Sequence, residues 1–414
     1  MVPRFPVGGK YDLSAAAEKV RQICDTYGFD VNPKQKVCDM SVSQKQTVEI
    51  VKLLYRGVDT LILDEPTAVL TPQEADRLFD VMRNMRAEGK SVIIITHKLN
   101  EVLSISDRVA VLRKGTFAGE VLTAETNAQE LTDMMVGHSV SLNIDRPESR
   151  PRHRMERIRV KNLTVRDHEG VTKLDDVSFS TYNGEILGIA GISGSGQKEL
   201  LESIAGLQRP ESGSVEYVVN TVGELEEVEQ LVGMDPVKIA ELGIVLSFVP
   251  EDRLGMGLVG NMDLADNMML RSYRNGTSPF VDRKAPRQLA ERVVDELAVK
   301  TPGIDTAVSS LSGGNVQKIL VGREIASAPT VLLCAYVVRG LDVGSSHLIY
   351  DLLNRQKGNG ASVVFVGEDL DVLLELCDRI LVLCGGKVSG IVDARTATKA
   401  QLGLMMTKME GGEA

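Results

Sequence analysis

Short apolar runs alternate with longer amphipathic stretches along the first part of the chain. The runs are apolar at consecutive positions, so both faces of each strand are expected to be buried, which is typical of a parallel sheet covered by helices on both sides. The predicted strands are residues 60–63, 91–96 and 108–112, and the predicted helices are residues 10–30, 39–54 and 74–86. This alternation predicts an α/β fold.

The same pattern returns 271 residues later. The offset holds without a gap through Ser41/Ser312, Gln46/Gln317, His97/Glu368, Asp107-Arg108/Asp378-Arg379 and Gly115/Gly386. A fixed offset of this kind is the signature of a repeated domain. At one position the copies differ in chemistry, because Asp64-Glu65 in the first copy becomes Ala335-Tyr336 in the second. We therefore expect two copies of one domain, with the chemistry kept in the first and lost in the second.

A glycine-rich turn follows an apolar run in the second copy. The segment GISGSGQ at residues 191–197 lies between ILGIA and a stretch of helical character at residues 199–204. Backbone N–H groups of such a turn and the positive end of the next helix bind phosphate oxygens, although a plain tight turn can have the same composition. The turn fits the skeleton GxxxxGK[ST], with Gln197 at the lysine position and Lys198 at the Ser/Thr position. Subtracting 271 from 191 gives −80, so we expect the chain to be truncated before this turn of the first copy.

Composition narrows the class of protein. The chain has 414 residues, of which 43% are apolar, enough for roughly two to three domains with substantial cores. Its apolar runs, such as residues 363–366, are far shorter than the roughly 18–20 residues of a membrane helix, and no secretory signal opens it. Five cysteines without a CxxC pair favour reduced thiols over disulfides or a zinc site. The net charge of −10 disfavours general nucleic-acid binding.

Two segments interrupt the alternation. Residues 141–157 contain Pro147, Pro151 and several arginines, which predicts an exposed linker, with a polybasic docking site as the alternative. The acidic stretch GELEEVE at residues 223–229 predicts a surface insertion between strands, with a partner contact as the alternative. The expected domains are therefore residues 1–140 and 158–414, joined by the linker 141–157.

Five motifs together carry a resemblance to a known family. They are LILDEPTAVLTPQE at 61–74, THKLNEV at 96–102, FVPEDR at 248–253, LSGGNVQK at 311–318 and RGLDVG at 339–344. With these motifs the chain resembles the ATP-binding cassette (ABC) ATPases, specifically the tandem-cassette subunits of bacterial importers for simple sugars and nucleosides. The PEDR and THKL segments resemble the nucleoside-importer branch of this family most. The resemblance implies two tandem P-loop NTPase domains with mostly parallel sheets and helical subdomains, the first incomplete, and it implies ATP and Mg²⁺ as cofactors.

The resemblance also assigns roles to residues. Asp64 would hold Mg²⁺, Glu65 would polarise the attacking water, and His97 would contact the γ-phosphate. Without the resemblance, an acidic pair at a strand end can instead cap the next turn. The implied nucleotide-binding residues are Gly191, Ser193, Gly194, Ser195, Gly196, Gln197, Lys198, Glu199, Ser312, Gly313, Gly314, Gln317, Ser41, Ser43 and Gln44.

Departures from the family pattern gather in the second cassette. The reacting positions there hold Ala335, Tyr336, Glu368 and Glu251, and Gln197 replaces the lysine. These changes remove the metal ligand and positive charge where phosphate charge develops, so this cassette is expected to bind nucleotide weakly and hydrolyse none. In the first copy Val42 and Ser43 stand for two glycines, which hinders close approach to phosphate.

Cassettes of this family pair head to tail, so the resemblance implies that Asp64, Glu65 and His97 share one nucleotide with Ser312-Gly313-Gly314. The expected protein is the energising subunit of an importer on the cytoplasmic face of the membrane. Its expected partners are membrane permease subunits, indirectly an extracellular substrate-binding protein, and an upstream segment that supplies the first P-loop; nucleic acid is not expected. Alternatives are a non-hydrolysing pseudo-ATPase or nucleotide-sensing docking protein, and a soluble tandem cassette acting on ribosomes, which the short Pro/Arg linker disfavours.

Overall fold

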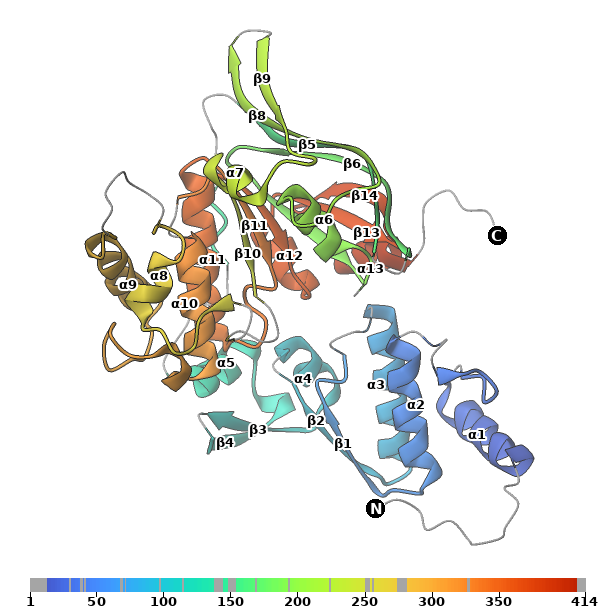
Figure 1. Cartoon of the computed structure of the whole chain (residues 1–414). Helices are drawn as coiled ribbons and strands as arrows, with labels where there is room; N and C mark the ends of the chain where they lie inside the picture. Colours follow the sequence, from blue (N-terminus) through green and yellow to red (C-terminus); the bar gives the residue numbers. More distant parts are fainter. Residues whose placement is uncertain are drawn as a thin grey trace, which may run out of the picture. The chain divides into compact units, whose positions relative to one another are not determined.

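The chain folds into two compact units, divided between Leu131 and Thr132. Each unit combines strands and helices (Figure 1). The computed structural model describes residues 13–29, 31–37, 40, 42–67, 70, 72–96, 98–113, 115–137, 144–147, 154–167, 170–192, 194–222, 225–249, 254, 257–273, 281–325 and 328–407.

The first unit carries two small sheets. Its elements are α1 (Leu13–Tyr27), α2 (Val42–Tyr55), β1 (Thr60–Asp64), α3 (Pro72–Ala87), β2 (Ser91–Ile95), α4 (Leu99–Ile105), β3 (Arg108–Arg113), β4 (Thr116–Leu122), the 3-10 turn Thr123–Glu125 and α5 (Ala128–Val136), which crosses the division. Strands β1 and β2 pair in parallel, and β3 and β4 pair antiparallel in a separate sheet. Leu61 and Leu63 of β1 pack with Phe79, Met82 and Met85 of α3 in the core of this unit.

The second unit contains a larger sheet. Its elements are β5 (Glu156–Arg166), β6 (Thr172–Tyr182), β7 (Ile186–Gly191), α6 (Gln197–Ile204), β8 (Ser212–Val222), β9 (Leu225–Gln230), α7 (Pro236–Glu241), β10 (Ile244–Phe248), α8 (Leu264–Met269), α9 (Lys284–Glu296), the 3-10 turn Val308–Ser310, α10 (Gly313–Ile325), β11 (Val331–Ala335), α11 (Val343–Gly358), β12 (Ser362–Val366), α12 (Leu370–Leu376), β13 (Arg379–Cys384), β14 (Lys387–Asp393) and α13 (Lys399–Thr407). The six-stranded sheet has the order β10-β11-β12-β7-β13-β14, parallel except for β14. Strands β6-β5-β8-β9 form a separate antiparallel sheet.

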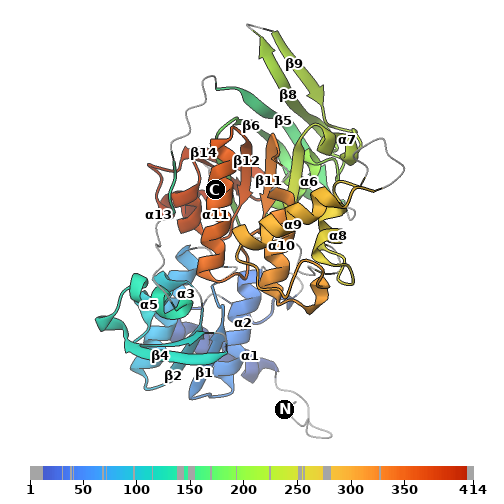
Figure 2. The same ribbon diagram turned by 90° about the vertical axis from the view of Figure 1, so that its left-hand side faces the viewer.

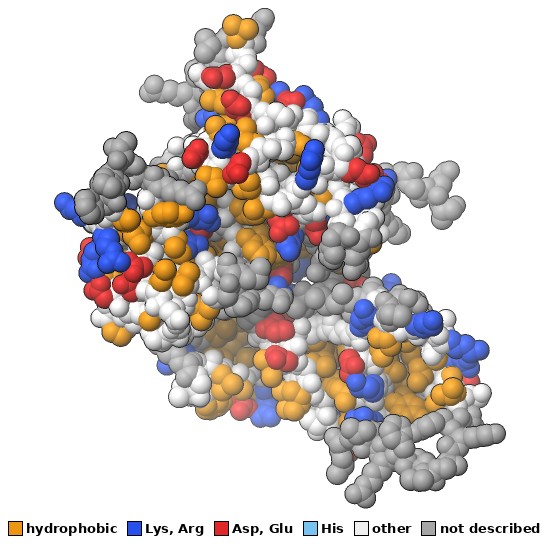
Figure 3. Space-filling view, viewed as in Figure 1, with side chains coloured by type: hydrophobic (Ala, Val, Ile, Leu, Met, Phe, Trp, Pro, Cys, Tyr) orange, Lys and Arg blue, Asp and Glu red, His pale blue; other side chains and the backbone are white. Residues whose placement is uncertain are grey.

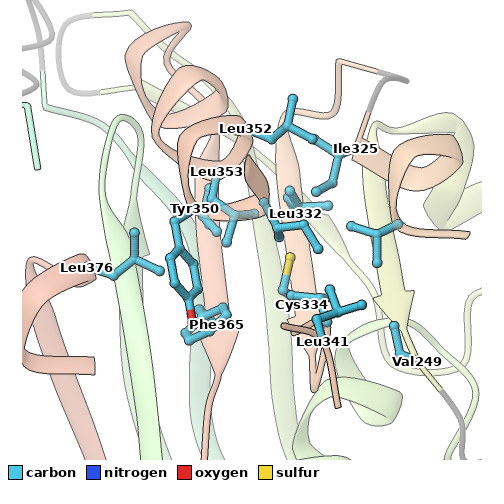
Figure 4. Packing of buried hydrophobic residues seen from close by; sticks show 14 of the residues in the cluster. Val249, Ile325, Leu332, Cys334, Leu341, Tyr350, Leu352, Leu353, Phe365 and Leu376 are labelled. Atoms are coloured by element: carbon cyan, nitrogen blue, oxygen red, sulfur yellow. The ribbon is translucent and has the colours of Figure 1, made fainter. Parts of the chain in front are cut away.

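Both faces of the six-stranded sheet are buried. One face packs against α11, where Tyr350 and Leu353 lie over Leu332 and Phe365 (Figure 4). The other face contributes to a cluster that also includes α6 and the antiparallel sheet. Helices α8, α9 and α10 gather at one side of this unit (Figure 2). The doubly covered parallel sheet predicted from the sequence is thus confirmed in the second unit.

The repeat is visible in the structure. Strands β1, β2, β3 and β4 correspond to β11, β12, β13 and β14, and every one of these pairs begins 271 residues apart. The strand register also repeats, because Thr60 pairs with Ser91 as Val331 pairs with Ser362. The predicted α/β fold with two tandem domains is therefore confirmed.

Two expectations need correction. Among the described residues, the sheet of β1 and β2 is covered on one face only, since its outward residues alternate with buried residues in β1 and half-buried residues in β2. The acidic stretch lies at the surface as predicted, but its described residues form part of strand β9, residues 225–230, which extends β8 by antiparallel pairing, and not a connection between strands. Arg159 of β5 stabilises this edge through ion pairs with Glu216 and Glu226. Within the described residues, no helix is long and apolar enough to cross a membrane.

Candidate functional site

The glycine-rich turn joins β7 to α6 in the second unit. Gly194 and Gly196 have φ angles of 88° and 97°, which glycine adopts without strain. A Cβ atom on Gly196 would lie 2.4 Å from Cδ2 of Leu174 and 2.5 Å from the carbonyl oxygen of Lys173. The turn therefore lies directly against the start of β6, and only glycine fits at position 196.

The side chains at the lysine and Ser/Thr positions point to different places. Gln197 is buried, and its Nε2 donates a hydrogen bond to the carbonyl of Ile192 at 3.2 Å. Lys198 is half exposed, lies 3.6 Å from Glu202, and has its Nζ 5.9 Å from the ring centroid of Phe248. An uncharged amide thus lies inside the turn, whereas the Lys198 ammonium lies near Glu202 and Phe248. Of the remaining predicted residues, Ser195 is buried, Glu199 is half-buried, and Ser193 lies outside the described residues.

The acidic pair Asp64-Glu65 lies at the carboxyl end of β1. Asp64 is exposed, and Glu65 has a φ of 45°, with its N–H donating to the carbonyl of Ile95 at 2.8 Å. Tyr336 repeats this backbone in the second unit, with a φ of 57° and an N–H bond to Val366 of 3.3 Å. The two units thus form the same strained turn, which carries a glutamate in the first unit and a tyrosine in the second.

A polar network supports the acidic pair in the first unit. Thr67 donates to Oε1 of Glu101 at 2.6 Å, and Nζ of Lys98 lies 3.3 Å from the same oxygen. The hydroxyl of Thr96 accepts the backbone N–H of Lys98 at 3.1 Å and lies 3.4 Å from Oε2 of Glu101. The network therefore joins the segment after Glu65 to the residues on either side of position 97.

The sequence analysis missed this network, although the repeat carried the signal. The four positions become apolar, glycine or of opposite charge in the second copy, where they hold Val338, Gly367, Asp369 and Val372. These polar residues are therefore present in the copy that also holds Asp64 and Glu65. His97, which this network flanks, lies outside the described residues, as do Ser41 and Glu251.

An aromatic and ionic cluster occupies the corresponding place in the second unit. Tyr336 packs edge-on against Phe248 with ring centroids 6.5 Å apart, and Arg339 lies 5.9 Å from the Tyr336 ring. Arg339 also pairs with Glu368 at 3.5 Å. Burial raises the pKa of Tyr336, and the nearby Glu368 raises it further. The phenol is therefore neutral at physiological pH and cannot act as a base.

The LSGG segment begins α10. The carbonyl of Ser312 accepts the N–H of Val316 at 2.9 Å, and its hydroxyl accepts the amide of Asn315 at the same distance. Gly313 and Gly314 open the helix, and a Cβ on Gly314 would meet only Leu341, at 3.7 Å.

Gln317, which the resemblance assigned to nucleotide binding, bonds to the backbone of its own unit. It is buried, and its Nε2 donates to the carbonyl of Val337 at 2.7 Å. Gln46 makes the same bond to Pro66 in the first unit. Both glutamines thus tie the start of a helix to the turn after the acidic position. Ser43 lies in α2 and Gln44 is half-buried there.

The acidic end of β1 fits a magnesium ion, whereas its counterpart does not. Magnesium in phosphate-transfer sites is usually held by one or two carboxylates together with phosphate and water. Asp64 supplies one exposed carboxylate, and Ala335 supplies none. Among the described residues, no group of three or more His, Cys, Asp or Glu side chains could hold a metal by itself.

Sequence comparison shows which family of known proteins this chain resembles. Residues 174–334 match the family model of the ABC transporter, and the chain is 38% identical over 402 residues to the nucleoside import ATP-binding protein NupA of Lactococcus lactis, across 96% of this chain and 77% of that protein. The chain belongs to the ABC transporter family. Other ABC relatives are the glucose import ATP-binding protein TsgD13 of Haloferax volcanii, 39% identical over 99% of this chain and 72% of its own, and the guanosine import ATP-binding protein NupO of Bacillus subtilis, 38% identical over 98% and 78%. The resemblance stated from the five motifs is confirmed.

Proposed function

We propose that this ABC protein is the ATP-binding subunit of an importer for nucleosides or simple sugars. Its relatives named for nucleoside, guanosine and glucose import align with nearly the whole chain. A subunit of this kind binds permease subunits at the cytoplasmic side of the membrane and reaches an extracellular substrate-binding protein only through them. Nucleosides are the first candidates, because the THKLNEV and FVPEDR wording is closest to that branch.

The observation that carries the proposal is the asymmetry between Asp64-Glu65 and Ala335-Tyr336 on the same backbone turn. Asp64 would hold Mg²⁺, which neutralises charge on the transferred phosphate when it is bound. Glu65 would accept a hydrogen bond from the attacking water, and His97 would orient it. The network around Glu101 fixes the backbone that carries both groups.

The second unit has a different proposed role. Its turn keeps the glycines that approach phosphate, while Gln197 and the Tyr336 cluster supply neither a metal ligand nor a base. It would hold a nucleotide without hydrolysing it. Hydrolysis in the transporter would then occur only at the site that contains Glu65.

The experiment compares two matched substitutions in the assembled transporter. Glu65→Gln removes the water-positioning carboxylate and should lower steady-state ATP hydrolysis by about 10²–10³-fold. Tyr336→Phe, at the equivalent turn, should leave hydrolysis nearly unchanged. Equal losses from the two variants would contradict the assignment. Uptake of a labelled nucleoside and of labelled ribose by the same preparation tests the solute.

A non-hydrolysing, nucleotide-sensing docking protein is the second candidate. It is favoured by the uncharged amide in the phosphate turn and by the neutral phenol at position 336. If this candidate is correct, the assembled protein binds ATP with no turnover, and Glu65→Gln changes neither binding nor docking to the permease.

A further inference from the structure

Two positions of the second unit depart from a magnesium site in a related way. In P-loop NTPases the ion is held by the Ser/Thr that follows the lysine of the turn and by an aspartate at the end of a strand. Here the Ser/Thr position holds Lys198, and the position that is Asp64 in the first unit holds Ala335. One ligand is thus replaced by a methyl group and the other by a cation. Loss of the metal alone does not require a positive charge at position 198.

The Lys198 ammonium lies at the edge of the sheet where the carboxylate is missing. Its Nζ is 5.9 Å from the ring centroid of Phe248, the last residue of β10. Phe248 is the register partner of Ala335, the last residue of β11. Because β7 runs parallel to these strands, the glycine-rich turn that follows it lies at the same edge. Helix α6, which carries Lys198, packs over β11, with Leu201 and Ala335 in one buried cluster.

The other polar side chain of the turn adds no charge. Gln197 is buried, and its amide is engaged by the carbonyl of Ile192. Among the described residues of segment 191–199, Lys198 is therefore the only cation. Its side chain is 52% exposed and so accessible to an anion from solution. A polyphosphate at this turn meets backbone N–H groups and one positive charge.

An ordinary surface ion pair is the competing explanation for Lys198. Its Nζ lies 3.6 Å from Glu202, one helical turn later. Figure 3 shows acidic and basic side chains interspersed on the face of this unit that it presents. Helix pairs of this kind contribute little to stability, so the ammonium can exchange Glu202 for a more highly charged anion. The pair also gives no reason for a lysine at a magnesium position.

We propose that the second unit binds its nucleotide without a metal ion, and that the Lys198 ammonium supplies the positive charge that Mg²⁺ supplies where both ligands are present. A cation fixed at this position also repels Mg²⁺ electrostatically. The inference rests on the proposed nucleotide site of the second unit and adds which form of the nucleotide binds there. A single ammonium neutralises less phosphate charge than a divalent ion, which agrees with binding in the absence of hydrolysis.

The test follows the turn itself by hydrogen exchange in the full chain. Exchange at the amides from Gly194 to Ile204 is measured against the concentration of the slowly hydrolysed analogue ATPγS, once with excess Mg²⁺ and once with excess EDTA. These amides belong to the second unit, so the readout is local to its turn and to α6. The analogue should slow exchange in both solutions, with half of the effect reached in EDTA at a concentration no higher than in Mg²⁺.

Three variants separate the charge of Lys198 from its bulk. Lys198→Gln should raise the concentration for half of the effect in EDTA by about 10–100-fold, the loss expected for one hydrogen bond to a charged group. Lys198→Arg keeps the charge and should retain binding in EDTA. Lys284→Gln, at the exposed first position of α9 in the same unit, is the matched control and should leave the concentration unchanged. Exchange without the analogue should be the same in all variants, which shows that the fold is kept.

Each contrary result overturns a different step. Protection that requires Mg²⁺ in the unaltered chain would refute the metal-free site and leave nucleotide binding by the second unit in place. Undiminished protection of Lys198→Gln in EDTA would refute the role of Lys198, as would a larger loss from Arg339→Gln, which changes the cation next to Tyr336. No protection in either solution would refute the proposed nucleotide site together with this inference, so the two failures are distinguishable.

Discussion

Gly194 and Gly196 offer a matched pair of substitutions in the phosphate turn. Both have positive φ angles, but a Cβ atom on Gly194 would meet nothing within 4 Å, whereas one on Gly196 would collide with Leu174 and Lys173. Gly194→Ala therefore carries the backbone cost alone, and Gly196→Ala adds a steric cost. The difference between the two variants isolates the packing of the turn against β6.

The expected magnitudes follow from these two costs. A non-glycine residue in the left-handed region costs about 1–2 kcal/mol, which is the whole expected loss for Gly194→Ala. Forcing an extra methyl group into a packed contact costs about 1–3 kcal/mol more, so Gly196→Ala should lose about 2–5 kcal/mol in total. One contact of Gly196 is a backbone oxygen, which cannot move aside as a side-chain end can.

Native-state hydrogen exchange at the β12 amides measures these losses, because that strand lies deep in the second unit. Gly194→Ala should lower protection by about 5–30-fold, and Gly196→Ala should lower it at least about fivefold further. Phosphate affinity of the turn should fall more for Gly196→Ala as well. Equal protection in the two variants would show that the turn does not lie against β6 as described.

Three further outcomes follow from side chains away from the turn. Gln317→Leu removes the bond to the carbonyl of Val337 and should destabilise the second unit by about 1–3 kcal/mol, measured by urea unfolding. Burial and the hydrogen bond to Glu88 raise the pKa of Tyr27 to about 12, so the late part of the tyrosinate absorbance titration should lose one ionisation in Tyr27→Phe. The stabilisation of the folded state by this raised pKa is complete below the unfolded pKa of about 10 and disappears as pH rises through 12. Burial raises the pKa of the Cys334 and Cys377 thiols, so both should resist iodoacetamide until the protein is unfolded, as mass spectrometry of the alkylated protein would show.

Much of the fold could be predicted because the sequence contains two copies of one domain, which can be compared with each other. A single offset places β1 against β11 and Gln46 against Gln317, and the structure repeats both the strand register and the glutamine hydrogen bond. The apolar runs were sufficient to predict strands. They could not show that Ile93 is exposed, because exposure depends on which elements cover the face, and a residue run carries no such information.

The acidic residues of the candidate site could be predicted from the sequence, but the polar network beside them could not. Asp64-Glu65 stand out by type at a strand end, whereas Thr67 and Glu101 are ordinary polar residues in the sequence, 34 positions apart, and only the fold brings their side chains within 2.6 Å. The reverse holds for Gln317, whose motif suggests a ligand and whose buried amide instead binds a backbone carbonyl. A motif therefore shows which part of the chain forms the candidate site. The structure is needed to tell which of its side chains bond to the backbone of the protein itself.

The left-handed turn at Tyr336 has a consequence for engineering. Its φ of 57° is a conformation that side chains rarely adopt, yet the N–H bond to Val366 keeps it as Glu65 keeps its own. The second unit therefore has the backbone conformation that carries Glu65 in the first unit, with a tyrosine side chain in place of the acid. Rebuilding a carboxylate at position 336 would need no remodelling of the main chain, while a metal ligand at the buried Ala335 would first need a path for water. A carboxylate at position 336 would therefore be easier to introduce than a metal ligand at position 335.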